Sequence, residues 1–210
     1  MKKLVLPLLC VALFAACNNN PKGNKAATSE AVTDSLSTEG TVYNIDTVSS
    51  TLHWTGSKVT GSHHGTVRIQ SGKVLLNGQN HLVGGDFTVD MKSIVNEDLK
   101  GNDEYKNKLE NHLKSEDFFH VEKNPTATFK ITEVKNQTST SADVSGNLTI
   151  RGISKNITFP VQLVSSSNDA VTATADFNIN RKDWGIVYEG MKDDLIADEI
   201  NLKVSVTAKK

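Results

Sequence analysis

The chain has 210 residues, with 23 basic and 24 acidic side chains and a formal net charge of −1. This balance lacks the basic excess that a nucleic-acid-binding surface needs, so no nucleic acid is expected as a partner. The 37% of hydrophobic residues, 14 glycines and only four prolines are typical of a globular protein and exclude collagen-like and proline-rich chains. Both cysteines, Cys10 and Cys17, lie near the N-terminus. The body of the chain therefore has no disulfide, thiolate nucleophile or cysteine-based metal site.

Residues 1–17 have the features of a secretory signal peptide. Two lysines follow the initial methionine, and the apolar run at residues 4–16 is too short to cross the ~30 Å hydrocarbon core of a bilayer as a helix. The run ends in Leu-Phe-Ala-Ala-Cys, which resembles the lipobox of bacterial lipoproteins, except that phenylalanine stands where leucine is commonest. This resemblance implies lipidation at Cys17. The alternative is an ordinary signal peptide, with Cys17 removed or left free.

Lipidation would decide the location of the protein. Several acyl chains on Cys17 would hold it on a membrane without a spanning helix. We therefore expect an exported lipoprotein that faces the periplasm or the cell surface of a bacterium, with the outer membrane as the expected site. Residues 18–40 are mostly Asn, Lys, Thr, Ser, Ala and Glu and carry too little apolar surface to offset the cost of ordering. They are predicted to form a flexible tether between this anchor and the body.

From about Thr41 onward, apolar and polar residues alternate with a period of two, which is typical of strands with one apolar side. The alternation is clearest at residues 87–91, 127–131, 144–150, 157–163, 171–179 and 200–206. Turn residues separate such segments, among them Asn77-Gly78, Gly84-Gly85 and Arg151-Gly152. About eight antiparallel strands can close into a barrel that holds either side chains or one small ligand. The sequence predicts an all-β fold, an eight-stranded antiparallel β-barrel, over residues 41–209.

One segment departs from the strand period. In residues 103–119 the spacings of three and four favour an amphipathic helix inserted into the sheet and ending before Pro125. Its apolar side chains are Tyr105, Leu109, Leu113, Phe118 and Phe119. Packed against one end of the barrel, they would cover its mouth as a lid. Plain packing without a lid is the interpretation we favour.

Five sequence blocks occur in an order that resembles one known family. They are DTVSSTLHWT (46–55), KVTGSHHGT (58–66), LKSEDFFHVEKNPTATF (113–129), VSGNLTIRGISKNI (144–157) and FNINRKDWG (177–185). Each block alone is weak, but the ordered set resembles the YceI-like family over nearly all of residues 41–209. Two departures from the family pattern bear on the identity of the ligand more than on the fold. His53 and Trp54 stand where Ser and Val types are commoner, and Trp184 where phenylalanine is usual.

The resemblance implies a lipocalin-like barrel, exported to the periplasm, that binds polyisoprenoids, isoprenoid quinones or related lipids in its lumen. Such ligands need an apolar tunnel with one or two polar groups at the mouth. The inward-facing candidates are Trp54, Phe87, Val89, Phe129, Ile131, Leu148, Ile150, Phe159, Val161, Phe177, Ile179, Leu202 and Val204. For each of them, core packing around no ligand is the alternative, because strand parity identifies a face and not a cavity.

The loop at residues 181–185, Arg-Lys-Asp-Trp-Gly, is the most distinctive in the chain. Arg181 and Asp183 could pair and fix this loop at the barrel rim, which is the interpretation we favour. Alternatively, Arg181 and Trp184 could meet a ligand head group at the mouth.

Motifs for catalysis and metal binding are missing from the sequence. It contains no G-x-S-x-G, P-loop, G-x-G-x-x-G or HExxH motif, and the adjacent His63 and His64 would point to opposite faces of a strand. We expect no catalytic residue, no metal and no cofactor apart from a bound isoprenoid lipid or quinone. The leading hypothesis is a membrane-tethered carrier or scavenger, and the runner-up is a non-catalytic envelope interaction module with a filled barrel core. An enzyme acting on a lipid held inside has the least support, and the sequence leaves a homodimer open.

Overall fold

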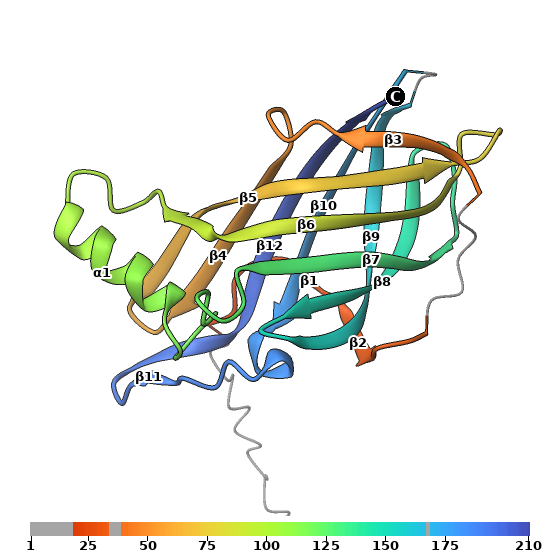
Figure 1. The fold of residues 1–210 in the computed structure, drawn as a ribbon. Helices are drawn as coiled ribbons and strands as arrows, with labels where there is room; N and C mark the ends of the chain where they lie inside the picture. The colour runs from red at the N-terminus through yellow and green to blue at the C-terminus, as the bar shows by residue number, and fades with distance from the viewer. Residues whose placement is uncertain (1–18, 34–38, 167–168) are drawn as a thin grey trace, which may run out of the picture.

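The computed structural model describes residues 19–33, 39–166 and 169–210, and the signal-peptide and lipidation predictions at residues 1–17 lie outside this part. Eight strand positions form a closed antiparallel barrel, with neighbours in the order β4, β5, β6, β7, β8, β9, β10 and β12 (Figure 1). The strands are β4 (Thr51–Lys58), β5 (Gly61–Leu76), β6 (Leu82–Asn96), β7 (Thr126–Lys135), β8 (Ser141–Ile150), β9 (Ile153–Ser166), β10 (Ala170–Asn180) and β12 (Asp194–Lys209). The predicted all-β barrel with one helical insertion is confirmed.

A short additional strand shares one of the eight strand positions. β3 (Thr41–Ile45) pairs with the end of β5 at Lys73–Leu76 and with the end of β12, while β4 pairs with the other halves of the same two strands. β3 and β4 thus share one strand position, interrupted by a turn at residues 46–50. The carboxylate of Asp46 caps this turn by accepting hydrogen bonds from the backbone N–H groups of Val48 and Ser49. The predicted break at Gly84-Gly85 is wrong, because both residues lie within β6.

The closing seam between β9 and β10 is only partly paired. The two strands pair directly from Val171–Ser166 to Thr174–Gln162 and then separate. Past that point β10 pairs with β1 (Asn24–Lys25), and β9 pairs with β2 (Ala27–Glu30). The side chain of Ala26, between β1 and β2, is 4% exposed and belongs to the main hydrophobic core. The chain's own N-terminal residues therefore fill a gap in the barrel wall.

We call residues 21–30 the N-terminal strap. The buried Asn178 donates a hydrogen bond to the carbonyl oxygen of Pro21 at 2.8 Å, and Lys155 forms an ion pair with Glu30 at the other end of the strap. A Cβ atom on Gly23 would lie 2.3 Å from Asn178 Oδ1, so only glycine fits against this side chain. The prediction of a flexible tether over all of residues 18–40 is therefore wrong for the strap. Its composition gives little apolar burial, but backbone pairing to two open strand edges supplies the order.

The helix α1 (Asp103–Lys114) ends five residues before the predicted boundary at Phe119. The side chain of Asn102 caps it by accepting from the N–H of Tyr105, and Asp103 and Glu104 in the first turn suit the helix dipole. No residue of α1 is fully buried. Within the described residues, no helix has the length and apolar character needed to span a membrane.

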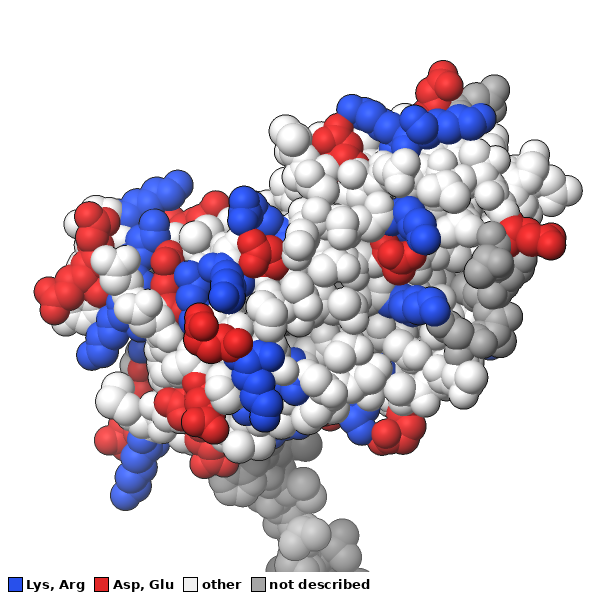
Figure 2. Space-filling view, in the orientation of Figure 1, with Lys and Arg blue, Asp and Glu red and all other residues white. Residues whose placement is uncertain are grey.

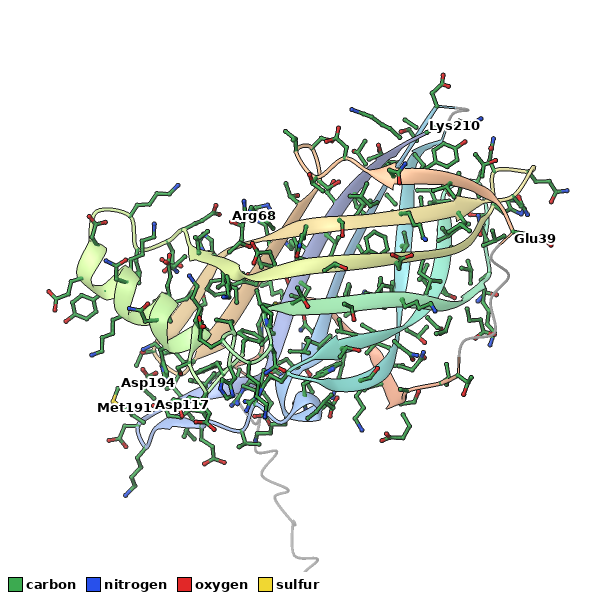
Figure 3. The ribbon with its side chains drawn as sticks, viewed as in Figure 1. Glu39, Arg68, Asp117, Met191, Asp194 and Lys210 are labelled. Carbon is green, nitrogen blue, oxygen red and sulfur yellow. The ribbon has the colours of Figure 1, made fainter. Side chains whose placement is uncertain are left out.

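The barrel has two distinct ends (Figure 3). At one end lie α1, the short helix η1 (Arg181–Trp184) and the hairpin of β11 (Gly190–Met191), marked in Figure 3 by Asp117, Met191 and Asp194. At the other end lie Lys210 and the hairpin loops that follow β5, β7 and β9. We call these the helix end and the hairpin end. On the face seen in Figure 2, acidic and basic side chains are interspersed, and they are densest around the helix end.

Candidate functional site

A cavity of about 270 Å³ runs through the barrel, close to the lower end of the ~300–1,000 Å³ range of small-molecule sites. It extends from Arg181 and Trp184 at the helix end to Asn80 and Gln137 in the loops of the hairpin end. Apart from these two loop residues and Thr174, Arg181 and Glu199, the lining side chains are apolar. This lumen can therefore take an elongated, mostly hydrocarbon molecule.

Aromatic rings form a band around the inside of the lumen. Phe87, Phe129, Phe159 and Phe177 follow one another with ring centroids 6.3, 5.5 and 4.0 Å apart, and the last pair is stacked. The ring of Phe129 on β7 lies over Gly146 on β8, the strand between β7 and β9. A Cβ atom there would lie 2.3 Å from the Phe129 ring. The Phe159–Phe177 stack spans β9 and β10, the two strands of the seam.

The structure brings all thirteen predicted lumen residues to the cavity wall. They are Trp54, Phe87, Val89, Phe129, Ile131, Leu148, Ile150, Phe159, Val161, Phe177, Ile179, Leu202 and Val204. Their contact with a ligand stays a prediction. The wall also contains residues that the sequence reasoning missed, including Leu52, Leu82, Met91, Ile94 and Ile196. Leu52 could have been found, because it shares the parity of Trp54 on the same strand.

The helix end is closed by buried side chains. Arg181, Trp184 and Ile186 are at most 1% exposed. The Arg181 guanidinium donates to the carbonyl oxygens of Ala197 at 2.9 Å, Ile186 at 2.6 Å and Ile196 at 3.3 Å. Trp184 Nε1 donates to the carbonyl oxygen of Leu148 at 3.0 Å. We call residues 181–186 the closed end.

The hydrogen bonds of Arg181 and Trp184 support the structural role that we favour for the 181–185 loop. The carboxylate that faces Arg181, however, is not that of Asp183. Arg181 faces Asp198 at 3.7 Å, and Lys182 shares this carboxylate at 2.8 Å. No pair between Arg181 and Asp183 occurs among the described contacts. Burial lowers the pKa of the Arg181 guanidinium, while the charges of Asp198 and Glu189 act to raise it. An arginine stays protonated despite such a shift, so the closed end retains a buried, fully engaged cation.

The predicted lid residues divide into two groups. Leu113, Phe118 and Phe119 line the cavity from the helix end. Phe118 packs with His112 and Tyr188 in an aromatic cluster whose ring centroids lie 4.8–5.7 Å apart. Tyr105 is 61% exposed, and neither Tyr105 nor Leu109 lines the cavity. Tyr105 and Leu109 therefore make no lid contact with the cavity in the structure.

Trp54 stands apart from the other polar groups of the wall. Among the described residues, its Nε1 is the buried side-chain nitrogen or oxygen that has no hydrogen-bond partner. The indole lies opposite Gly65 on β5, where a Cβ atom would come within 2.9 Å of the ring and 1.9 Å of the Val95 carbonyl oxygen. Glycine at this position makes room for the indole in the wall.

His63 and His64 form exposed contacts with Asp98. The carboxylate of Asp98 accepts from His63 Nδ1 and from the backbone N–H of His64, both at 2.8 Å, and from Asn96 Nδ2. Burial acts to raise the pKa of Asp98, but these hydrogen bonds together hold it below its usual value. In the part of the chain that the structure describes, no cluster of three or more His, Cys, Asp or Glu side chains could hold a metal ion.

Sequence comparison identifies relatives across the barrel. A sequence model of the YceI-like domain matches residues 43–208. A UPF0312 protein of Pseudomonas paraeruginosa is 52% identical over 58 residues, which cover 28% of this chain and 30% of that protein. A UPF0312 protein of Pseudomonas putida is 32% identical over 132 residues, 57% of this chain and 68% of that protein. The chain thus spans less than a third of the first relative and about two thirds of the second.

Two solved structures resemble the fold over most of its length. BcnA of Burkholderia cenocepacia superimposes with a TM-score of 0.65 at 21% identity, covering 79% of this chain and 99% of that one. A polyisoprenoid-binding domain of Saccharophagus degradans implicated in plant cell wall breakdown gives a TM-score of 0.58 at 15% identity, covering 80% and 97%. At these identities the likeness supports the architecture of the barrel.

Proposed function

The chain belongs to the YceI-like domain family, and from this premise we propose that it binds one long apolar isoprenoid lipid or isoprenoid quinone in its lumen. The observation that carries the proposal is the continuous cavity, walled by apolar side chains from the closed end to the hairpin end. The polyisoprenoid binding named for the Saccharophagus degradans neighbour supports the same class of ligand.

The band of phenylalanines suits such a ligand. An isoprenoid chain carries methyl branches along its length, and these pack well against aromatic faces. Burial of apolar surface contributes roughly 25 cal/mol per Å² relative to water. A bilayer offers the same chain a similar apolar environment, so net extraction depends on the shape of the lumen and on the few polar contacts inside it.

We further propose that the protein acts as a carrier or scavenger tethered to the cell envelope, at the outer membrane, through a lipid on Cys17. Cys17 lies only four residues before Pro21, where the strap is fixed to the barrel by Asn178. A lipid at Cys17 would therefore keep the barrel close to the bilayer that supplies its ligand. Loss of envelope attachment and of incorporated radiolabelled palmitate in a Cys17→Ser variant would support this. Unchanged labelling would contradict it.

Organic extraction of natively expressed protein, followed by mass spectrometry, tests the binding function. We expect one dominant isoprenoid or quinone at close to one molecule per protein. Ala173→Phe adds bulk inside the lumen, since Ala173 lines the cavity, and should abolish the bound lipid. Val164→Phe is the matched control, because Val164 lies on neighbouring β9 and is 63% exposed. Equal lipid content in both variants would contradict binding in the lumen.

The runner-up function is an envelope interaction module that uses the outer surface of the barrel. This alternative assumes a barrel core filled by side chains, whereas the described residues enclose a cavity. A folded protein without lipid in the extract, together with a crosslinked envelope partner insensitive to Ala173→Phe, would favour this module. Turnover of the bound lipid by purified protein would instead revive an enzymatic role.

A further inference from the structure

The N-terminal strap carries little of the apolar burial that holds the other strands of the barrel. Within residues 21–30, the buried side chains are those of Pro21 and Ala26, and every residue of β1 and β2 is exposed. Segments with few buried apolar contacts and exposed backbone hydrogen bonds open locally at a small fraction of the free energy of global unfolding. The strap can therefore leave the wall while the eight main strands stay folded.

Polar groups on the outer face of the barrel hold the strap in place. Asn178 donates to the carbonyl oxygen of Pro21 at 2.8 Å and accepts from Asn201 at 2.9 Å. Lys25 of the strap faces Glu199 at 3.9 Å. Asn178 and Asn201 alternate along their strands with residues that line the lumen, so their side chains point outward. Water can hydrate these outward groups once the strap lifts, which keeps the cost of its release low.

The strand segments that the strap covers carry lumen side chains on their inner face. β1 pairs with β10 at Phe177, and β2 pairs with β9 at Ile157. Both side chains line the cavity, and the Phe177 ring stacks on that of Phe159 across the seam, with centroids 4.0 Å apart. Where the strap is released, these rings and not a backbone ladder separate the lumen from the outside. Side chains can move aside without breaking strand pairing.

A groove of about 420 Å³ lies on the outer face beside the seam. Its lining includes Asn24 of β1, Pro160 and Gln162 of β9, and Thr174 of β10. β9 pairs with β2 up to Thr158 and with β10 from Gln162, so the described residues provide no partner on this side of β9 in between. A proline suits this stretch, because it lacks the N–H that a central strand needs. Thr174 lines both the groove and the lumen, which therefore lie on either side of the same strand.

The two ends of the barrel are less suited to exchange with a bilayer. At the closed end, the buried Arg181 and Trp184 are engaged in hydrogen bonds to backbone carbonyl oxygens. The hairpin end lies at the opposite end from Asn178, which holds Pro21 just before η1. The proposed anchor on Cys17 directly precedes the strap in sequence. This anchor would therefore bring the strap, and not the hairpin end, close to the membrane.

We propose that the strap closes a lateral entrance to the lumen. Its release from β9 and β10 opens the wall at the seam, and a lipid with a long apolar chain passes there between the bilayer and the cavity. Redocking of the strap on Asn178 and Asn201 closes the wall again. This inference rests on the proposed binding function and adds to it the route by which the ligand enters and leaves.

A disulfide between the strap and β9 tests this entrance. Ala27 and Thr158 are directly paired in antiparallel register, and such pairs have Cα atoms about 4.5–5.5 Å apart, within the span of a disulfide. The variant Ala27→Cys/Thr158→Cys, with both native cysteines replaced by serine, is loaded in reduced form from phosphatidylcholine vesicles containing tritiated geranylgeraniol. It is then oxidised, and thiol titration confirms the crosslink. Release into empty vesicles should become at least about tenfold slower than from the reduced protein.

The matched control is a disulfide in the wall away from the seam. Lys73 of β5 and Asp86 of β6 are also directly paired in antiparallel register, and both are about half exposed. Lys73→Cys/Asp86→Cys in the same cysteine-free background should release geranylgeraniol at the same rate before and after oxidation.

Gly23→Ala tests the opposite change. A Cβ atom on Gly23 would lie 2.3 Å from Asn178 Oδ1 and 2.5 Å from Asn201 Nδ2, so the strap could not seat fully. Release should be about threefold faster or more, and amide hydrogen exchange in residues 24–30 should rise with it. Gly78→Ala is the control, because a Cβ atom there meets nothing within 4 Å.

The outcomes separate the lateral entrance from the function on which it rests. Equal release from the oxidised and reduced strap variant would place exchange at an end of the barrel and overturn the entrance. Faster amide exchange in Gly23→Ala without faster release would overturn it as well. Wild-type protein that is folded by circular dichroism and takes up no geranylgeraniol would instead overturn the proposed binding function.

Discussion

The closed end of the barrel and the wall formed by β4 each place a tryptophan against the lumen, but they treat its polar atom differently. In the closed end, Trp184 donates to Leu148 and the buried Arg181 donates to three carbonyl oxygens. On β4, the N–H of Trp54 has no acceptor in the protein. The hydrogen bonds of Arg181 and Trp184 stabilise the closed end, whereas the buried N–H of Trp54 contributes no hydrogen bond to the fold.

The largest expected effect is on stability, at Arg181. Arg181→Ala leaves three carbonyl oxygens of the closed end without donors and creates a void, so the free energy of unfolding should fall by about 3–5 kcal/mol. Urea denaturation measures this change. Lys182→Ala is the control, because the neighbouring Lys182 is 39% exposed and also pairs with Asp198; its cost should stay below about 1 kcal/mol. Similar losses in both variants would remove the special role of the closed end.

The same substitution at the two tryptophans sharpens the comparison. Trp184→Phe removes the side-chain donor to the Leu148 carbonyl oxygen and opens space at a fully buried position, so it should cost about 2–3 kcal/mol. Thermal and urea unfolding would report this loss. Retention of wild-type stability would show that the Trp184 hydrogen bond contributes nothing.

At Trp54 the effect on stability should be small. Trp54→Phe removes an unpaired donor and thins a wall that already faces a cavity, so the two effects oppose each other. The unfolding free energy of ligand-free protein should stay within about 1 kcal/mol of wild type. A loss as large as that of Trp184→Phe would mean that Trp54, too, is a structural residue.

The smallest effect concerns pH and lies outside the lumen, at Asp98. Because hydrogen bonds lower the pKa of Asp98 in the folded state, its contribution to stability is complete above the usual carboxyl pKa of about 4. That contribution is lost as the pH falls toward the lowered pKa. Asp98→Asn should therefore cost about 1 kcal/mol or less at about pH 7, and the difference from wild type should shrink at about pH 3. A gap that widens in acid would contradict this assignment.

Local pattern was enough to predict the barrel and the inward-facing set. Alternation along a strand fixes which side chains share a face, and closure of the sheet turns that face into a lumen wall. The helix was found by its spacing but given five residues too many. Phe118 and Phe119 look like a continued apolar stripe, whereas they fold back in turns toward the lumen after Lys114.

Contacts between distant segments could not be predicted from such patterns. The strap has the composition of a disordered segment, and it is ordered by pairing with β9 and β10. The alternation of apolar and polar residues within β9 and β10 does not reveal that these two strands separate. The partner of Arg181 is likewise distant in sequence: Asp198 sits on β12, while the nearby Asp183 looked like the natural choice. The unpaired state of the Trp54 N–H emerges only once every acceptor around it has been placed.

The strap also determines where this chain can be shortened. A version starting at residue 43, where the family resemblance begins, would lack β1 and β2 and lose the buried Ala26. The separated halves of β9 and β10 would then expose rows of unpaired backbone N–H and C=O groups. Exposed strand edges of this kind template pairing with other chains. Trimming the apparently dispensable leader would thus turn a closed barrel into a self-associating one, and the first boundary that preserves closure lies before Pro21.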